Sequence, residues 1–269
     1  MADLGLKVEA WIQSRFDKPI SGLGEARYQV ITADTKILEW VPIWILKYKE
    51  SVVIFARKEW VSDLEDLIKL TDKDMLFSIY GTYELARITL PDKVNIMGPS
   101  YYLFGDKEKC KLDVDLRVFI PDTEELASVD KDIFWHCYLD SPVSAFAVQT
   151  HGEISALATV TDRGENVYEI GMEVERSAQG SGMGRAVVNG AVQWILERGG
   201  TPLATVGSFN VPSTRTLRSV GLTYYLTDMV GGFGDFVVPP QALGTPINDI
   251  DIHNFYPDWA MNPMIKSKQ

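Results

Sequence analysis

The sequence predicts a mixed α/β (α+β) fold, and three observations along the chain support this class. Stretches with the two-residue period of strands alternate with stretches that have the spacing of amphipathic helices. Hydrophobic residues make up 46% and charged residues 23% of the 269 residues, which is close to the globular average and allows a full core. No apolar run approaches the roughly 20 residues that are needed to cross a bilayer.

The first 105 residues show helical and strand-like patterns in alternation. We expect helices at residues 4–16, 59–70 and 74–90 and strands at residues 42–48 and 51–56. The second of these helices places Trp60 and Leu64 on one face, and Pro91 ends the third. No motif with a chemical role occurs in this half, so we interpret residues 1–105 as an α/β domain for packing, dimerisation or shaping of the substrate site.

From residue 106 the pattern predicts a second, larger domain that extends to residue 240. We expect strands at residues 112–120, 143–150, 154–161, 167–174, 203–206 and 222–229, and helices at residues 121–134, 182–198 and 212–220. His151 and Gly152 provide a turn signal between two of these strands. Residues 231–269 are rich in Gly, Pro and Asn, and we expect residues 241–269 to form a tail that packs on the domain.

The charge and the cysteine content favour a cytoplasmic protein that binds neither nucleic acid nor membranes. The formal net charge is -11 and the pI is about 4.8, so the surface repels polyanions. The first residues lack the charged-then-apolar pattern of a signal peptide. Cys110 and Cys137 lie far apart without metal-ligand spacing, and we interpret them as reduced thiols in a protein that holds no metal.

A glycine-rich turn between a strand and a helix carries the functional prediction. Residues 174–185 place Gly180, Gly182 and Gly184 at the start of the expected helix 182–198. Glycine lets a backbone approach a ligand closely and adopt a positive φ without penalty. The first amides of a helix have no internal partners and carry partial positive charge, so the turn is suited to bind a diphosphate.

Two other phosphate-binding motifs are disfavoured, and one structural explanation stays open. A dinucleotide-binding turn requires an acid roughly 20 residues further on, and residues 199–206 contain none. No Gly-Lys-Ser/Thr sequence occurs, which excludes a P-loop. The remaining alternative is that the three glycines serve only tight packing between the helix and its neighbours.

The residues around the turn resemble the acetyl-CoA motif of the GNAT superfamily of N-acetyltransferases. That motif is Gln/Arg-x-x-Gly-x-Gly/Ala after a strand that ends in a valine. Gln179, Gly182 and Gly184 occupy its fixed positions, and Val174 stands at the usual distance before them.

A second element of the same family occurs downstream at the expected distance. Asn210-x-x-Ser213, followed by Gly221-Leu222, is similar to the family signature Asn-x-x-Ala/Ser and Gly-Phe, which spans the cofactor-side helix and the last strand. The resemblance covers about residues 112–230. It implies a mixed, mostly antiparallel GNAT sheet flanked by helices, preceded here by the smaller α/β domain.

The resemblance also implies acetyl-CoA as the co-substrate and assigns contacts to it. The backbone at Met172 and Val174 would pair with the pantetheine arm, and Asn210 and Ser213 would contact the pantetheine or the thiol end. Asn210 also suits the N-terminal turn of a helix, which is the structural alternative for this residue. The residues that would cradle the pyrophosphate or lie beside it are Gln179, Gly180, Ser181, Gly182, Met183, Gly184 and Arg185.

A glutamate on the strand before the turn often serves as the base in this family, and Glu169 is our choice. Deprotonating an amine with a lysine-like pKa near 10.4 costs about 4–5 kcal/mol at pH 7, and a carboxylate can accept that proton. Glu169 and Glu173 share one face of the expected strand, and a solvated surface acid is the alternative for both. His136 and His151 are isolated in the sequence, and we interpret them as structural.

The proton for the leaving thiolate has no obvious donor in the sequence. The family's usual tyrosine would fall at Leu217, which has no proton to donate. Tyr224 is therefore our second catalytic candidate, with Tyr225, Ser213 or water as alternatives.

Taken together, these patterns predict transfer of an acetyl or other acyl group from acyl-CoA to a primary amine of a small-molecule or amino-acid-like acceptor. Two alternatives stay open: a catalytically idle CoA-binding or regulatory protein on the same scaffold, and a protein N-acetyltransferase. The expected partner is a small-molecule amine, and a homodimer is left open.

Overall fold

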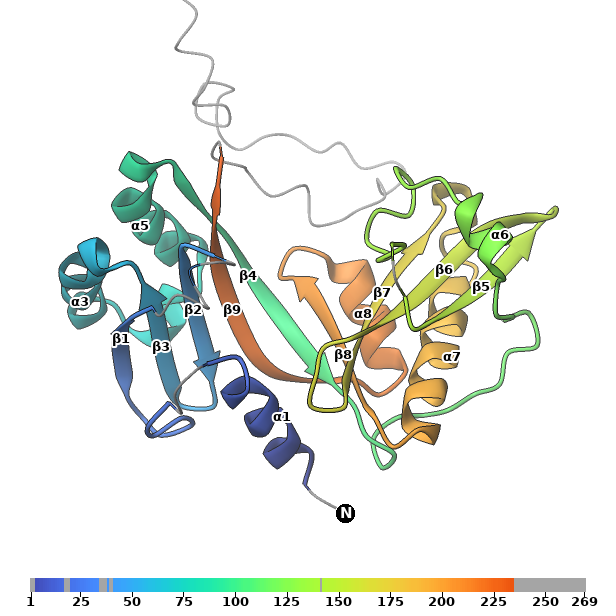
Figure 1. Cartoon of the computed structure of the whole chain (residues 1–269), viewed down its shortest axis with the longest axis horizontal. Coiled ribbons are helices and arrows are strands. Elements are labelled where there is room, and N and C mark those ends of the chain that lie inside the picture. Colours follow the sequence, from blue (N-terminus) through green and yellow to red (C-terminus); the bar gives the residue numbers. More distant parts are fainter. Residues whose placement is uncertain (1–2, 17–19, 34–37, 39–40, 141, 235–269) are drawn as a thin grey trace, which may run out of the picture.

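The computed structural model describes residues 3–16, 20–33, 38, 41–140 and 142–234 (Figure 1). The first elements are α1 (Leu4–Gln13), β1 (Tyr28–Thr32), β2 (Ile43–Tyr48), β3 (Ser51–Ala56), η1 (Lys58–Trp60), α3 (Val61–Leu70), α4 (Lys73–Leu76), α5 (Ile79–Thr89), η2 (Leu90–Asp92) and β4 (Val94–Phe104). They are followed by α6 (Thr123–Ala127), β5 (Ser144–Thr150), β6 (Glu153–Asp162), β7 (Val167–Val174), η3 (Arg176–Ala178), α7 (Met183–Glu197), β8 (Thr201–Gly207), α8 (Val211–Ser219) and β9 (Thr223–Phe233).

The described strands form one continuous sheet in the order β1-β3-β2-β9-β4-β8-β7-β6-β5. Neighbouring strands run antiparallel except in the pairs β1–β3 and β7–β8, so the sheet is mixed and mostly antiparallel, as predicted. Figure 1 shows the long strands β9 and β4 running between the two halves of the molecule. β4 belongs to the first 105 residues but lies between β9 and β8, so sheet hydrogen bonding continues across the predicted domain boundary, and the division of the chain there stays a prediction.

Helices pack on both faces of the sheet, because side chains along a strand point alternately to either face. In β7, Tyr168 and Ile170 pack in the cluster that contains the buried stripe of α7, whereas Val167 packs in the cluster that contains α1. Near the other end of the sheet, α3 and α5 pack on β2 and β3 through residues such as Leu64 and Ile45. The odd-numbered residues of β7 therefore lie on the face of the sheet against which α1 packs.

Elements with an uninterrupted period are confirmed. The strands predicted at residues 143–150, 154–161 and 167–174 are β5, β6 and β7, and the helices predicted at residues 182–198 and 212–220 are α7 and α8. His151 and Gly152 have φ values of 53° and 87° and close the hairpin between β5 and β6, as the turn signal indicated.

The prediction of a strand at residues 112–120 is wrong. Only Phe119 makes a bridge, to Ala147 of β5, while Val114 and Leu116 are 76% and 95% exposed. The physical reason is a local turn: the Asp115 side chain accepts hydrogen bonds from the backbone and the guanidinium of the residue two positions later, which competes with strand pairing.

Two predicted helices are shorter than expected. Residues 74–90 split into α4 and α5, because the chain turns so tightly between them that a Cβ on Gly81 would lie 1.9 Å from the carbonyl oxygen of Leu76. The helix predicted at residues 121–134 ends at Ala127 as α6, where the hydroxyl of Ser128 bonds back to the carbonyl of Glu125.

Strands β1 and β4 were not predicted. β4 contains Gly98 and Pro99, which are turn signals in a sequence, yet the strand continues through them with a shift of register between Met97 and Ser100. β1 is a short strand whose side chains are mostly half-buried, so its alternation is weak.

Several expectations concern regions or properties beyond the sheet. The tail predicted at residues 241–269 lies outside the described residues. Cys110 and Cys137 are buried free thiols. Within the described part of the chain, no helix combines the length and the apolar character that spanning a membrane requires.

Candidate active site

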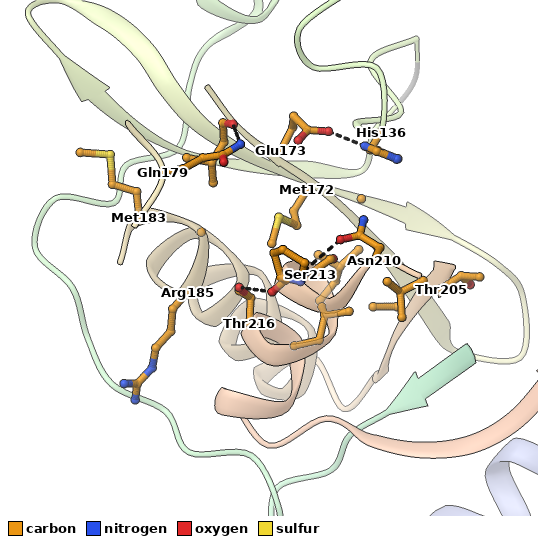
Figure 2. A pocket seen from close by; sticks show the side chains of 18 of the residues that line it. His136, Met172, Glu173, Gln179, Met183, Arg185, Thr205, Asn210, Ser213 and Thr216 are labelled. Carbon is orange, nitrogen blue, oxygen red and sulfur yellow. Dashed lines mark hydrogen bonds and ion pairs between the residues drawn. The ribbon is translucent and has the colours of Figure 1, made fainter. Parts of the chain in front are cut away.

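The parallel strands β7 and β8 separate and open a cleft toward their carboxyl ends. Residues 167–169 pair with residues 201–203, and no pairing between the two strands follows among the described residues. Beyond that point, among the described strands, β7 pairs only with β6 and β8 only with β4. The resulting cleft has a volume of about 810 Å³ and is lined by β7, β8, the glycine-rich turn, α7 and α8 (Figure 2). An extended ligand there can pair with strand backbone as an added strand would.

Two of the three glycines shape the turn at one end of the cleft. Gly180 and Gly182 have left-handed φ values of 76° and 80°, and Gly182 is the N-cap of α7. A Cβ on either glycine would meet no atom of the described residues within 4 Å, so this side of the turn is open in the described part of the chain. Among the described residues no side chain caps α7, and its first amides therefore keep their hydrogen atoms for a ligand.

Gly184 also lines the cleft, but its absent side chain serves packing. A Cβ at this position would lie 3.1 Å from Cγ2 of Val174, at the end of β7. The glycine-rich turn thus meets two requirements, because Gly180 and Gly182 leave room for a ligand and Gly184 lets α7 approach the strand.

The side chains of the turn are tied to neighbouring segments. Gln179 Nε2 donates to the carbonyl of the last residue of β7 at 3.3 Å, and the Ser181 hydroxyl donates to a carbonyl of η3 at 2.5 Å. Arg185 forms an ion pair with Asp113, with 2.5 Å between Nη2 and Oδ2, which holds it beside the turn. Met183, which lies between Ser181 and Arg185 in the sequence, also lines the cleft.

The walls of the cleft contain the other residues predicted to contact the co-substrate. Met172 and Val174 line it from β7 and pack with their side chains toward α7, which leaves their backbone along the opening. Asn210 Oδ1 accepts a hydrogen bond from the Ser213 amide at 3.1 Å, so Asn210 caps α8 as the structural alternative proposed. Asn210 and Ser213 both line the cleft as well, and Asn210 Nδ2 makes no hydrogen bond within the described residues (Figure 2).

The structure does not bring the predicted tyrosine to the cleft. Tyr224 is 51% exposed on β9, with its hydroxyl 2.5 Å from the Thr227 hydroxyl, and is absent from the lining of the cleft. Tyr225 accepts a hydrogen bond from Lys109 Nζ at 2.9 Å, also away from the cleft. Leu217, at the place of the family's tyrosine, is buried in the cleft wall. Of the three side chains considered as proton donors to the thiolate, Ser213 is the one that lines the cleft.

Glu169 lies where β7 and β8 part. It is the last residue of β7 that pairs with β8, and it is one of the residues that line the cleft. Its side chain is 11% exposed, and Oε2 lies 2.6 Å from Nε of Arg163. The predicted base is thus a buried, charge-paired carboxylate at the closed end of the cleft and not a solvated surface acid.

A histidine and a glutamate form a pair that the sequence analysis did not foresee. The Glu173 carboxylate bonds with Nδ1 of His136, and both side chains line the cleft (Figure 2). The loop that carries His136 crosses β7 so closely that a Cβ on Gly171 would lie 2.2 Å from the His136 carbonyl oxygen. An imidazole oriented by a carboxylate is suited to general acid–base chemistry. No sequence pattern connects the pair, because 37 positions separate them.

The comparison with protein families identifies the part of the chain that builds this cleft. The sequence profile of the acetyltransferase (GNAT) family matches residues 113–222. These residues form a GNAT-family domain. The domain contains the glycine-rich turn, both strands that part at the cleft, and α7 and α8. No curated protein matches the chain significantly.

The solved structures to which the chain is similar are distant in sequence. A GCN5-related N-acetyltransferase from Kribbella flavida is 20% identical, with 56% of this chain and 64% of that chain covered at a TM-score of 0.44. A GNAT-family acetyltransferase from Colwellia psychrerythraea is 12% identical, with 87% and 98% covered at 0.43. A GCN5-related N-acetyltransferase-like protein from Streptococcus suis is 13% identical, with 84% and 99% covered at 0.45. The chain spans less than two thirds of the Kribbella protein.

Proposed function

We propose that the protein transfers an acetyl or other acyl group from acyl-CoA to the primary amine of a small-molecule or amino-acid-like acceptor. The observation that carries the proposal is the course of the cleft, which leads from an open glycine-rich turn to the buried carboxylate of Glu169. The match to the GNAT family supports the reaction class. The nature of the acceptor is our own inference.

The chemistry of the cleft fits acyl-CoA. The diphosphate would lie on the amides that follow Gly180 and Gly182, where the first turn of α7 adds partial positive charge. The pantetheine arm would run along the backbone of residues 172–174, which has no partner strand on the β8 side among those described. The Asn210 amide and the Ser213 hydroxyl lie in the wall beside that path.

The proposed reaction is a direct attack of the acceptor nitrogen on the thioester carbonyl carbon, in which a C–N bond forms and the C–S bond breaks. An acceptor that arrives as an ammonium ion first loses one proton, and we assign Glu169 as the group that accepts it and returns it to solvent. The attacking amine loses a second proton as the amide forms, and the CoA thiolate takes up a proton. The products are the amide, the free thiol of CoA and one proton.

Glu169 suits the first proton transfer because of its place and its surroundings. A carboxylate positioned against the reacting nitrogen contributes about 10²–10⁴-fold to the rate of such reactions. At the closed end of the cleft it is shielded from bulk water, with a side chain 11% exposed. His136, oriented by Glu173, is the second candidate for proton transfer in the same cleft.

The proton for the thiolate would come from the Ser213 hydroxyl or from water. Ser213 lines the cleft on α8 beside Leu217, which has no proton to donate. A CoA thiolate is a good leaving group, so this proton transfer need not limit the rate.

A CoA-binding protein without turnover is the alternative function, and Leu217 is the observation that favours it. The distinguishing assay measures thiol release from acetyl-CoA with a panel of small amines, together with calorimetric binding of CoA. Turnover with at least one amine supports the enzyme. Tight CoA binding without turnover of any amine or peptide supports the alternative.

The assignment of the base is tested by Glu169→Gln. We expect kcat to fall about 10²–10⁴-fold while KM for acetyl-CoA stays within about two-fold. Glu153→Gln is the matched control, because Glu153 is an exposed acid at the far end of the neighbouring strand β6. An unchanged kcat in the Glu169 variant would refute its role as base and direct attention to His136.

A further inference from the structure

We propose that helix α1, near the N-terminus, positions Glu169 for catalysis by holding Arg163. The inference rests on the proposed role of Glu169 as the base, and it gives the N-terminal part of the chain a function in the reaction. The device has two links. Arg163 pairs with the Glu169 carboxylate, and residues of α1 and the turn after it bind the backbone of Arg163.

The first link fixes one oxygen of the carboxylate and leaves the other for a ligand. Arg163 Nε lies 2.6 Å from Glu169 Oε2, and the guanidinium lies over the ring of Tyr138, 4.9 Å from its centroid. The two charged side chains are 32% and 11% exposed. Within the described part of the chain Glu169 Oε1 makes no hydrogen bond, so this oxygen is left to accept a proton from a molecule in the cleft.

The second link fixes the backbone from which the Arg163 side chain projects. The carbonyl oxygen of Arg163 accepts hydrogen bonds from Trp11 Nε1 at 3.2 Å and from Arg15 Nη2 at 2.6 Å. The Arg15 guanidinium stacks on the Trp11 ring, 4.4 Å from its centroid. Trp11 in turn packs edge-on against Phe104 of β4, at 5.6 Å between ring centroids. The helix therefore docks on the sheet and on the β6–β7 turn with the same side chains.

The turn between β6 and β7 connects the two links. The Arg163 amide donates to the carbonyl of Val167, and the Val167 amide donates to the carbonyl of Gly164, both at 2.9 Å. Glu165 and Asn166 adopt left-handed φ values of 52° and 59° in between. These hydrogen bonds close the turn, so a shift of the Arg163 backbone moves the Arg163 guanidinium relative to the Glu169 carboxylate.

The proposed device differs in its expected effects from an ordinary ion pair. The Arg163 guanidinium is 32% exposed, so the loss of its pair with the buried Glu169 carboxylate costs less stability than the loss of a fully buried pair. Displacing a catalytic group by about 1 Å, in contrast, costs up to about 10²-fold in rate. Loss of Arg163 should therefore lower kcat in a protein that still folds and still binds CoA.

The test is a double-mutant cycle between Arg163 and Glu169 in the full chain. We expect Arg163→Gln to lower kcat roughly 10- to 100-fold with KM for acetyl-CoA unchanged, and Arg163→Lys to restore part of the loss. In the Glu169→Gln background, Arg163→Gln should change kcat by less than about two-fold. An equal loss in both backgrounds, or no loss in the wild-type background, overturns the proposal.

The link to α1 is tested by Trp11→Phe, which keeps the packed ring and removes the N–H donor. We expect kcat to fall roughly two- to ten-fold, which corresponds to one hydrogen bond, and to be unaffected when Arg163 is already glutamine. Trp60→Phe is the matched control, since Trp60 is a buried tryptophan whose Nε1 bonds to Asp92 at 2.8 Å, in the cluster of α3 and α5. Equal effects of the two substitutions reject positioning through α1.

These outcomes separate this proposal from the proposed function itself. Absence of turnover in the wild type, or a Glu169→Gln variant with normal kcat, overturns both. A Glu169→Gln variant with the expected loss, beside Arg163 and Trp11 variants without one, overturns only the positioning role. CoA affinity measured by calorimetry reports whether each variant is folded, because the glycine-rich turn lies on the opposite side of the cleft.

Discussion

Replacing Gly182 by aspartate tests the co-substrate site with little disturbance of the protein itself. Gly182 has φ of 80°, and a Cβ there meets no atom within 4 Å among the residues that the structure describes. The cost to the folded state is therefore that of an L-residue in the left-handed region, about 1–2 kcal/mol. For a domain of this size such a cost lowers Tm by about 2–8 °C. Gly182→Ala carries the same backbone cost and serves as the control.

The difference between the two variants isolates the effect of charge on CoA binding. A carboxylate roughly 5 Å from one charge of a diphosphate, at an effective dielectric constant of about 20, is repelled by about 3 kcal/mol. That repulsion corresponds to a loss of more than about 100-fold in affinity. Alanine adds only a methyl group on the open side of the turn, so its loss of affinity should be smaller than that of aspartate.

The assay is calorimetric titration of CoA into each variant, with thermal unfolding measured in parallel. Gly184→Ala extends the series, because its Cβ would lie 3.1 Å from Val174 and should lower stability without a backbone penalty. If Gly182→Asp binds CoA as tightly as the wild type, the diphosphate does not lie on this turn. In that case the reasoning about open amides at the start of α7 is wrong.

Two further predictions concern buried titratable groups. Burial raises the pKa of Asp228 to about 6, against hydrogen bonds from Tyr102 and Trp44 that lower it. The folded protein thus keeps this proton to higher pH than the unfolded chain, and the free energy of unfolding falls by about 3 kcal/mol as pH rises from about 4 to about 6. Asp228→Asn should abolish this fall in urea unfolding, and an identical pH dependence in variant and wild type would contradict the assignment. Burial also raises the pKa of Cys110 to about 11 and of Cys137 to about 12, so a thiol reagent near neutral pH should label both only after denaturation, and rapid labelling of the folded protein would show that they are exposed.

The parts of the fold that are predictable from sequence are those whose signal is local. β7 and α7 have unbroken periods and are separated by a turn with its own glycines, so the predicted bounds agree with the structure to within a residue. The co-substrate turn shares this property, since Gln179 to Gly184 lie within one short segment. The different roles of its glycines cannot be read from the local sequence, however, because the packing role of Gly184 depends on its distance from Val174 on another element.

The failures among the strands show how long-range pairing and local turns compete. β4 is a strand because β8 and β9 flank it on both sides, and this outweighs the turn signals of Gly98 and Pro99. The segment 112–120 alternates correctly for a strand but bridges its neighbour only at Phe119. Periodicity alone therefore describes what a segment is able to form, and the available partner decides what it does form.

The same reasoning applies to the two acids of β7, and there it decides function. Periodicity correctly places Glu169 and Glu173 on one face of the strand, yet it gives no reason to choose between them. In the folded protein Glu169 pairs with Arg163, whose guanidinium only donates hydrogen bonds, whereas Glu173 pairs with His136, whose imidazole nitrogens can both donate and accept a proton. The first pair is suited to hold a carboxylate in one place and the second to exchange protons with solvent. The cleft thus contains two acids of identical sequence pattern whose chemical roles are set by partners that lie elsewhere in the chain.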